Sequence, residues 1–143
     1  MIKVFPSLLT KQECQELLQF DDDRVKLYRP YPEMDEAIQR IVFPKLDFPI
    51  VSKGVVSKNN DIIPVCTHLD TVITDETHKL LIYLNPLSEG GGTDFLHRDG
   101  SLLQHVSHSE GGVVLFDIRL LHRGEAFPTT EIKRTCGLRV SFF

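Results

Sequence analysis

The sequence predicts a mainly β domain with N-terminal helices, arranged as a sandwich or jelly roll with the helices packed on one face. Two observations support this class. Helical patterns with capping signals are confined to residues 1–49. From residue 50 onward, short apolar runs alternate with turn signals, which indicates a series of short strands. The 143 residues contain no internal repeat, low-complexity tract or linker, so a single domain spanning residues 1–143 is expected.

The helical region contains two expected helices. Residues 10–13, Thr-Lys-Gln-Glu, form a capping box that begins the first helix. The second is expected to begin near Pro32 and to end at Pro44 and Pro49. Between them, the aspartate run 21–23 is expected to be a solvated turn. The apolar faces of the two helices are Leu17, Leu18 and Phe20 in the first, and Met34, Ile38, Ile41 and Val42 in the second.

Eight strands are expected in the remainder of the chain. They cover residues 50–57, 62–69, 79–84, 93–97, 102–105, 113–116, 120–125 and 137–142. Segments rich in glycine or in asparagine and aspartate separate several of them, at residues 59–61, 88–92 and 110–112.

Composition narrows the function classes. A hydrophobic fraction of 41% and a charged fraction of 25% are those of a soluble globular protein. The net charge of −4 argues against a dedicated nucleic-acid binder, which needs a cationic surface. Three cysteines without paired spacing favour a reducing compartment. With neither a signal peptide nor a spanning segment recognisable, a cytoplasmic protein without a membrane partner is expected.

Three residues form a candidate metal-ligand set. His68 and Asp70 are two positions apart in an expected strand, so both side chains point to one face. With His122 they supply two imidazoles and one carboxylate, the ligands of a facial-triad ferrous site. The pattern also arises by chance, because His97 and Asp99 repeat it.

Arg139 and Ser141 share one face of the last expected strand. A guanidinium buried there needs an anion, and it can bind a carboxylate through two parallel hydrogen bonds. The alternative is an edge-strand arginine that points to water. Other polar residues receive plainer interpretations: Cys66 as a small buried filler, Arg123 as a contact either to the substrate or to groups around the metal ligands, and His97, Asp99, His105 and His108 as solvated residues rather than a second metal site.

The stretch from His68 to the C-terminus resembles the Fe(II)- and 2-oxoglutarate-dependent dioxygenases, in particular the prolyl-4-hydroxylase-like branch. Each matching motif is weak alone, but all occur in the family's order. They are the His68-x-Asp70 pair, residues 80–85 (LLIYLN), residues 89–95 (EGGGTDF), residues 111–116 (GGVVLF), residues 122–124 (HRG) and residues 137–141 (GLRVS).

This resemblance implies a double-stranded β-helix (cupin-like) core over residues 50–143, supported by the helical residues 1–49. It also implies that His68, Asp70 and His122 are catalytic residues that hold Fe(II). The distal carboxylate of the cosubstrate 2-oxoglutarate would pair with Arg139, helped by Ser141 and Tyr83. O₂ would be consumed, with ascorbate as an optional cofactor. The expected reaction hydroxylates a substrate C–H bond, foremost a prolyl side chain of a protein or peptide and otherwise a small molecule, with release of succinate and CO₂.

Two features depart from the family pattern. The region before His68 lacks the family's cosubstrate-binding tyrosine, so Tyr83 or Asn60 is expected to replace it. Arg139 also follows His122 by 17 residues, more than is usual, and a loop insertion at residues 128–131 would absorb the difference. Arg134 is closer to the usual spacing, but it precedes an expected turn, so Arg139 is preferred.

Two other function classes fit the same residues. One is a zinc-type hydrolase or isomerase on a jelly roll, which would use the triad and ignore Arg139. The other is a non-catalytic binding module in which the triad is incidental. Metal content and binding of 2-oxoglutarate separate the three hypotheses. The sequence does not decide the oligomeric state.

Overall fold

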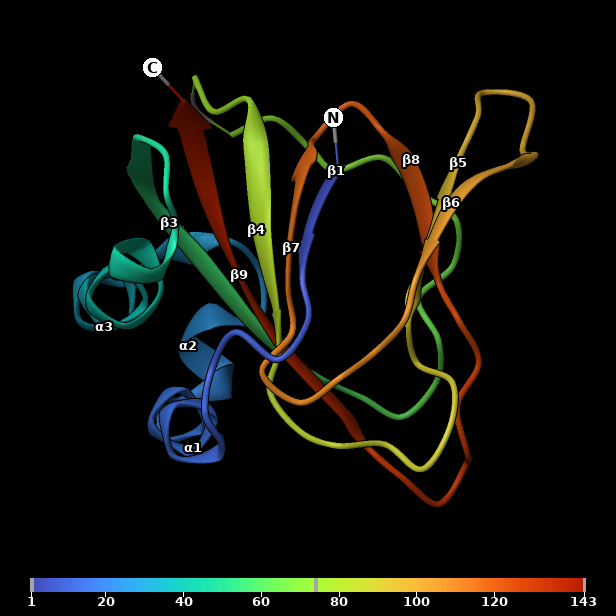
Figure 1. Ribbon diagram of the computed structural model, residues 1–143, viewed down its shortest axis with the longest axis horizontal. Coiled ribbons are helices and arrows are strands. Elements are labelled where there is room, and N and C mark those ends of the chain that lie inside the picture. The colour runs from blue at the N-terminus through green and yellow to red at the C-terminus, as the bar shows by residue number, and fades with distance from the viewer. Residues whose placement is uncertain (1, 74, 143) are drawn as a thin grey trace.

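The computed structural model describes residues 2–73 and 75–142, and it confirms the mainly β class. Two antiparallel sheets face one another, and the helices cover the outer face of the larger sheet (Figure 1). The larger sheet has the strand order β1-β7-β4-β9-β3-β2, and the smaller has β6-β5-β8. The strands are β1 (Ile2–Phe5), β2 (Arg29–Pro30), β3 (Ile50–Asp61), β4 (His78–Tyr83), β5 (Thr93–Leu96), β6 (Leu102–Val106), β7 (Val113–Asp117), β8 (Leu121–Gly124) and β9 (Lys133–Phe142).

The two expected helices begin where the sequence predicts, after Thr10 and at Pro32, but the aspartate run 21–23, expected to be a solvated turn, instead begins a short helix. The helices are α1 (Lys11–Leu18), α2 (Asp22–Val25), α3 (Pro32–Val42) and the short 3₁₀ turn η1 (Phe43–Lys45). The capping box is present: the hydroxyl of Thr10 accepts from the backbone N–H of Glu13, whose carboxylate accepts from the N–H of Thr10. Among the described residues, no helix has the length and apolar character needed to cross a bilayer.

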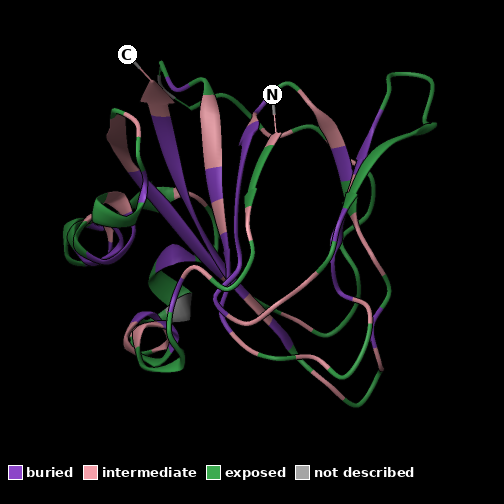
Figure 2. Ribbon diagram, in the orientation of Figure 1, coloured by how far each residue is buried: buried purple, intermediate pink, exposed green. Residues whose placement is uncertain are grey.

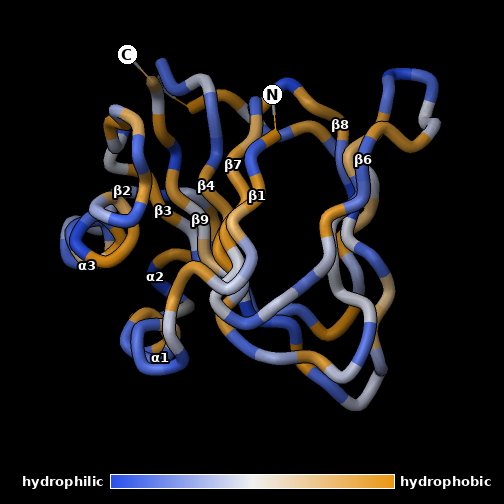
Figure 3. Tube along the Cα trace, in the orientation of Figure 1, coloured by the Kyte–Doolittle hydropathy of each residue, from blue (hydrophilic) through white to orange (hydrophobic). Residues whose placement is uncertain are grey.

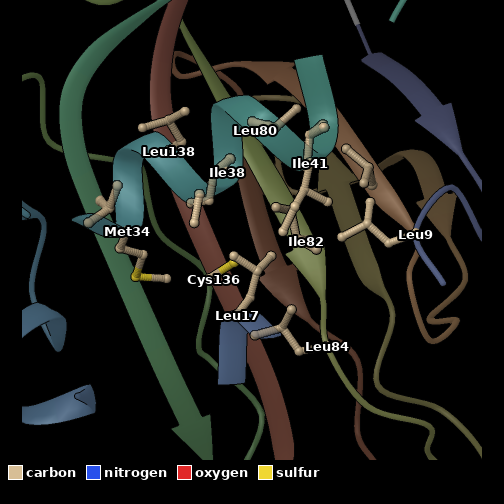
Figure 4. Packing of buried hydrophobic residues seen from close by; sticks show 14 of the residues in the cluster. Leu9, Leu17, Met34, Ile38, Ile41, Leu80, Ile82, Leu84, Cys136 and Leu138 are labelled. Atoms are coloured by element: carbon tan, nitrogen blue, oxygen red, sulfur yellow. The ribbon is translucent and has the colours of Figure 1, made fainter. Parts of the chain in front are cut away.

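The main hydrophobic core lies between the helices and the larger sheet. Because side chains alternate along a strand, Leu80 and Ile82 of β4 and Leu138 of β9 all face the helices. They meet Met34 and Ile38 of α3, as Figure 4 shows. In Figure 2 the central strands of this sheet are mostly buried. This core makes the larger sheet a rigid platform whose other face is free to carry polar groups.

The inner face of the same strands is polar in part. Hydrophilic and hydrophobic residues alternate along β9 (Figure 3), so its odd-numbered residues from Lys133 to Ser141 face the smaller sheet. On β4, Lys79 and Tyr83 lie on this inner face, opposite Arg139 and Thr135 of β9. A smaller apolar cluster closes the space between the sheets; its residues are Tyr83, Phe95, Val106, Val114 and Phe116.

Four details of the expected fold are wrong. Residues 62–69 form no strand; Pro64 lacks a backbone donor, and the segment is joined to β8 by the bridge between His68 and His122 and by a hydrogen bond from the N–H of Gly124 to the carbonyl of Val65. Residues 59–61 are not a turn but the end of β3, and β9 begins at Lys133 rather than at residue 137. The two extensions pair with each other, so long-range hydrogen bonding outweighs local turn preference. The N-terminal region is also not purely helical, because β1 joins the sheet beside β7.

Replacing Leu138 with alanine is expected to lower the free energy of unfolding by about 2–5 kcal/mol. The side chain is fully buried against the helices, so its loss leaves a cavity. Urea denaturation measures the change. Leu103→Ala is the matched control, since Leu103 is 43% exposed and should change stability by less than about 0.5 kcal/mol. Equal effects in the two variants would contradict this description of the core.

Candidate metal centre

His68, Asp70 and His122 come together at one end of the space between the sheets. The Nε2 atoms of His68 and His122 lie 3.3 and 3.6 Å from the same carboxylate oxygen, Oδ1 of Asp70. The three ligand atoms all lie within 4.8 Å of one another. Two backbone hydrogen bonds hold the histidines in register: the N–H of each donates to the carbonyl of the other, at 2.9 and 3.1 Å.

The two imidazoles are oriented for a metal by their other ring nitrogen. Nδ1 of His68 lies 2.9 Å from the carbonyl oxygen of Cys66, and Nδ1 of His122 lies 2.9 Å from that of Leu120. A carbonyl oxygen only accepts hydrogen bonds, so each Nδ1 carries the proton. In the neutral ring Nε2 is then unprotonated, and its lone pair is available to a metal ion beside Asp70, which is the usual arrangement of metal-binding histidines.

The charges of the triad also suit a divalent cation. Burial lowers the pKa of His122 to about 4, so this imidazole is neutral at physiological pH. Burial opposes ionisation of Asp70, but without a metal the protonated Nε2 of His68 donates a hydrogen bond to it, and this bond and the charge of Lys79 prevail and lower its pKa. That hydrogen bond in turn raises the pKa of His68. Oδ2 of Asp70 is buried without a hydrogen-bond partner. The donor set, two nitrogens and one carboxylate, fits Fe(II).

A cavity of about 310 Å³ adjoins the triad. It is large enough for a small organic ligand. Its lining includes inner-face residues of β3, β4 and β9, together with residues that precede β2. The polar and charged lining residues outside the triad are Lys26, Tyr28, Ser57, Asn59, Asp61, Lys79, Thr93, Arg123, Lys133 and Thr135.

Lys133 is a cavity residue that the sequence interpretation missed. It is 5% exposed, and its ammonium lies 3.5 Å from the carbonyl oxygen of Gly92 and 5.5 Å from the ring centre of Tyr83. Burial lowers its pKa to about 8. Side-chain alternation could have identified it: if the last strand begins at residue 133 rather than 137, Lys133, Thr135 and Arg139 share one face.

Tyr83, one of the expected cosubstrate residues, lies beside Lys133, although, like Arg139, it is not among the residues that line the cavity. It is 1% exposed, and its hydroxyl is 2.7 Å from Oγ1 of Thr93. Burial raises its pKa to about 12, so the phenol remains a neutral hydrogen-bond donor.

The structure places Arg139 and Ser141 differently from Tyr83. Arg139 is buried, but its Nη1 donates to the carbonyl of Thr71 at 2.7 Å and to the carboxylate of Glu76 at 3.0 Å. It is not among the residues that line the cavity. Ser141 is near the end of β9, where its hydroxyl lies 3.4 Å from the carbonyl oxygen of Asp75.

The other polar residues singled out in the sequence do not form a second metal cluster in the described part of the chain. Among the described residues, the triad is the group of metal-binding side chains in which three ligand atoms lie within 4.8 Å of one another. His105 instead pairs with Asp94 at 2.7 Å, and Arg123 approaches the same carboxylate at 3.3 Å. Asp99 accepts hydrogen bonds from Ser101.

Three smaller expectations have outcomes as well. Cys66 is exposed rather than buried, because it belongs to the irregular segment that precedes His68. On β3, Asn60 alternates with the cavity residues Asn59 and Asp61 and so points to the opposite face. Arg134 likewise follows Lys133 on β9 and lies on the other face of the sheet.

Glycine is needed at position 137, behind two residues that line the cavity, Tyr28 and Lys79. A Cβ atom added to Gly137 would lie 2.2 Å from the hydroxyl oxygen of Tyr28 and 3.1 Å from Cε of Lys79. The missing side chain therefore makes the room that Tyr28 occupies against β9, next to the triad.

Comparison with known proteins supports the fold. No family model matches the sequence, and neither does any curated protein sequence. Among solved structures, the viral collagen prolyl hydroxylase of Paramecium bursaria Chlorella virus-1, in its 2-oxoglutarate complex, is 15% identical with a TM-score of 0.68, over 99% of this chain and 96% of that one. A 2-oxoglutarate-Fe(II) oxygenase-family oxidoreductase of Burkholderia pseudomallei is 11% identical with a TM-score of 0.70, over 98% and 84%.

A third similar structure is a prolyl-4-hydroxylase of Pseudomonas putida, which is 16% identical with a TM-score of 0.61, over 98% of this chain and 84% of that one. The likeness covers nearly the full length of each protein, so it concerns the whole fold and not a shared motif. The chain therefore has the jelly-roll fold of the 2-oxoglutarate- and Fe(II)-dependent oxygenases, prolyl hydroxylases included, as the order of its motifs predicts.

Proposed function

We propose that this protein is an Fe(II)- and 2-oxoglutarate-dependent dioxygenase. The observation that carries the proposal is the convergence of two imidazole Nε2 atoms and one carboxylate at the end of a small-molecule cavity. Iron and 2-oxoglutarate, when bound with O₂, would supply the oxidising chemistry, in which decarboxylation to succinate and CO₂ accompanies hydroxylation of a substrate C–H bond. His68, Asp70 and His122 would hold the iron.

Lys133 is proposed to bind the distal carboxylate of 2-oxoglutarate, in the role that the sequence assigned to Arg139. It is a buried cation in the cavity wall, whereas the guanidinium of Arg139 already faces the carboxylate of Glu76. The neutral hydroxyl of Tyr83, beside Lys133, would donate a second hydrogen bond to the same carboxylate. Lys133 and Tyr83 would thereby orient the cosubstrate toward the triad.

The primary substrate is proposed to be a protein or peptide side chain, with proline as the first candidate. The cavity wall includes Leu27 and Val65, which are 68% and 41% exposed, and Leu69 between the metal ligands is 59% exposed. Such aliphatic side chains suit an apolar ring carried on an extended chain. The similarity to a viral collagen prolyl hydroxylase favours the same class of substrate.

Succinate release is the test of the proposed reaction. With Fe(II), 2-oxoglutarate, ascorbate and O₂, the protein is expected to form succinate, more rapidly when a proline-rich peptide is present. Omission of either Fe(II) or 2-oxoglutarate should abolish the signal. His68→Ala and Asp70→Ala should abolish it too, and full turnover in either variant would show that the ligand assignment is wrong.

The affinity for 2-oxoglutarate is expected to fall as the pH rises through about 8. Burial lowers the pKa of Lys133 to about 8, so the free protein loses this charge at a pH where an exposed lysine keeps it. Only the protonated form pairs with a carboxylate, so binding is strong below this pH and weakens above it, by up to about tenfold per unit. Calorimetry with Mn²⁺ between about pH 6.5 and pH 9.5 measures the change.

Lys133→Arg is the control for the pH experiment, because a guanidinium stays protonated throughout this range. Its dissociation constant should be independent of pH. A wild-type constant that is equally independent of pH would contradict the role of Lys133.

A further inference from the structure

Arg139 and Glu76 form an ion pair that is removed from water. Their side chains are 2% and 0% exposed, and Nη1 of Arg139 lies 3.0 Å from Oε1 of Glu76. Desolvation of two charges can cost more than their attraction returns, and apolar side chains of similar volume often stabilise a fold as well or better. The stability of the core therefore does not account for the pair, which points to a role in fixing local geometry.

The pair contacts and fixes the segment that follows the candidate metal ligand Asp70. Nη1 of Arg139 also donates to the carbonyl of Thr71 at 2.7 Å. Thr71 directly follows Asp70, so this bond fixes the peptide group next to the carboxylate ligand. Glu76, near the other end of the same connection, accepts the backbone N–H of Ile73 at 2.7 Å. Arg139 thus holds the connection between Asp70 and β4 at two points.

Asp70 depends on its backbone for its position. Its Oδ1 is shared by the two histidines, and its Oδ2 has no hydrogen-bond partner; the ammonium of Lys79 lies 3.7 Å away. Residues 62–70 also lack the continuous ladder of a strand: they are joined to β8 by the bridge between His68 and His122 and by one hydrogen bond at Val65, and neither of these links involves Asp70 itself. With neither a strand ladder nor a donor on Oδ2, the contact at Thr71 becomes a main determinant of where the carboxylate lies.

The arrangement also separates two neighbouring cations. Lys79 and Arg139 are direct partners across β4 and β9, which run side by side in Figure 1. Each faces its own carboxylate: Lys79 faces Asp70, and Arg139 faces Glu76. Glu76 therefore neutralises Arg139 close to the metal site and keeps the guanidinium from competing with a metal ion for Asp70.

We propose that Arg139 and Glu76 are positioning residues that hold the Asp70 carboxylate in place for the metal ion. This inference rests on the proposed function of the triad. It assigns Arg139 to the metal site, through the backbone, and not to the cosubstrate.

The test removes the pair without leaving a buried charge. Each single variant, Glu76→Met or Arg139→Met, leaves one buried charge without its partner and should lower the Tm of the metal-free protein. The double variant leaves no unpaired buried charge, so its Tm should return most of the way to that of the wild type. It is nevertheless expected to bind Mn²⁺ about 10- to 100-fold more weakly than the wild type, as losses of supporting contacts around metal ligands do. Its dissociation constant for 2-oxoglutarate at saturating Mn²⁺ should be unchanged.

Leu138→Ala is the matched control, because Leu138 neighbours Arg139 on β9 but faces the helices. It should lower the Tm and leave the affinity for Mn²⁺ unchanged. Should the double variant fail to fold, Arg139→Lys provides the second test. It keeps a paired charge but loses the fixed fork of donors, and its affinity for Mn²⁺ should lie between those of the wild type and the Met variant.

Each contrary result has a distinct meaning. Wild-type affinity for Mn²⁺ in the folded double variant, or in Arg139→Lys if the double variant does not fold, would overturn the positioning role. A raised dissociation constant for 2-oxoglutarate at saturating Mn²⁺ would return Arg139 to the cosubstrate site. A wild-type protein that binds no Mn²⁺ would overturn the proposed function together with this inference.

Discussion

Replacing His122 with alanine is expected to abolish succinate release and to weaken Mn²⁺ binding by more than about 100-fold, beyond the cost of losing a supporting residue. His122 is 6% exposed and supplies one of the two converging Nε2 atoms. Its removal leaves a single imidazole and one carboxylate, too few to hold a ferrous ion in a facial triad. Calorimetric titration with Mn²⁺ measures the affinity.

A loss of folding must be separated from the loss of a ligand. The imidazole of His122 packs against the rings of Phe116 and Phe95, with centroids 5.0 and 5.9 Å away. His122→Leu preserves this packing and should keep the Tm of the metal-free protein while still losing the metal. His105→Ala is the control outside the triad and should bind Mn²⁺ as the wild type does. Wild-type affinity in His122→Leu would show that the site does not use this residue.

Replacing Lys133 with alanine is expected to weaken binding of 2-oxoglutarate by about 10- to 100-fold, the usual value of a hydrogen bond to a charged group. Mn²⁺ binding should be unchanged, because Lys133 lies beside Tyr83 and is not a triad ligand. A cosubstrate analogue sharpens the measurement. The 2-oxo acid in which a methyl group replaces the distal carboxylate, 2-oxopentanoate, should bind wild type and Lys133→Ala equally.

Comparing 2-oxoglutarate with 2-oxopentanoate therefore measures the interaction between Lys133 and the distal carboxylate. In the wild type 2-oxoglutarate should bind more tightly than 2-oxopentanoate, and in Lys133→Ala the preference should disappear. If the preference persists in Lys133→Ala and disappears in Arg139→Met, the carboxylate partner is Arg139, as the sequence alone indicated.

The sequence predicted the fold class from patterns that are local and strong. The capping box at Thr10 and the proline at the start of α3 mark helix starts by short-range chemistry, and both are confirmed. The strand ends were less predictable. Asp61 and Lys133 are directly paired in the register of β3 and β9, a contact between residues far apart in sequence that turn propensity around Asn59 concealed.

The same strand boundary explains why the sequence interpretation assigned the cosubstrate to Arg139 and did not consider Lys133. When the strand was expected to begin at residue 137, Arg139 was the cation near its start. Because β9 begins at Lys133, this lysine lies on the same inner face as Arg139. Nor could the sequence show that Glu76, in an irregular segment, would meet Arg139. The triad, by contrast, was named in full from motif order, and the structure brings its three ligand atoms together.

Metal-dependent binding of 2-oxoglutarate is the most direct test of the proposal that the triad and its cavity form a dioxygenase site. The measurement is an anaerobic calorimetric titration of 2-oxoglutarate into the protein, with Fe(II), with Zn²⁺ and without metal. We expect tight binding with Fe(II) at one site per chain, no measurable binding without metal, and loss of binding in Asp70→Ala. Tight Zn²⁺ binding together with no binding of 2-oxoglutarate to the Fe(II)-loaded protein would contradict the proposal and favour a zinc-type hydrolase or isomerase.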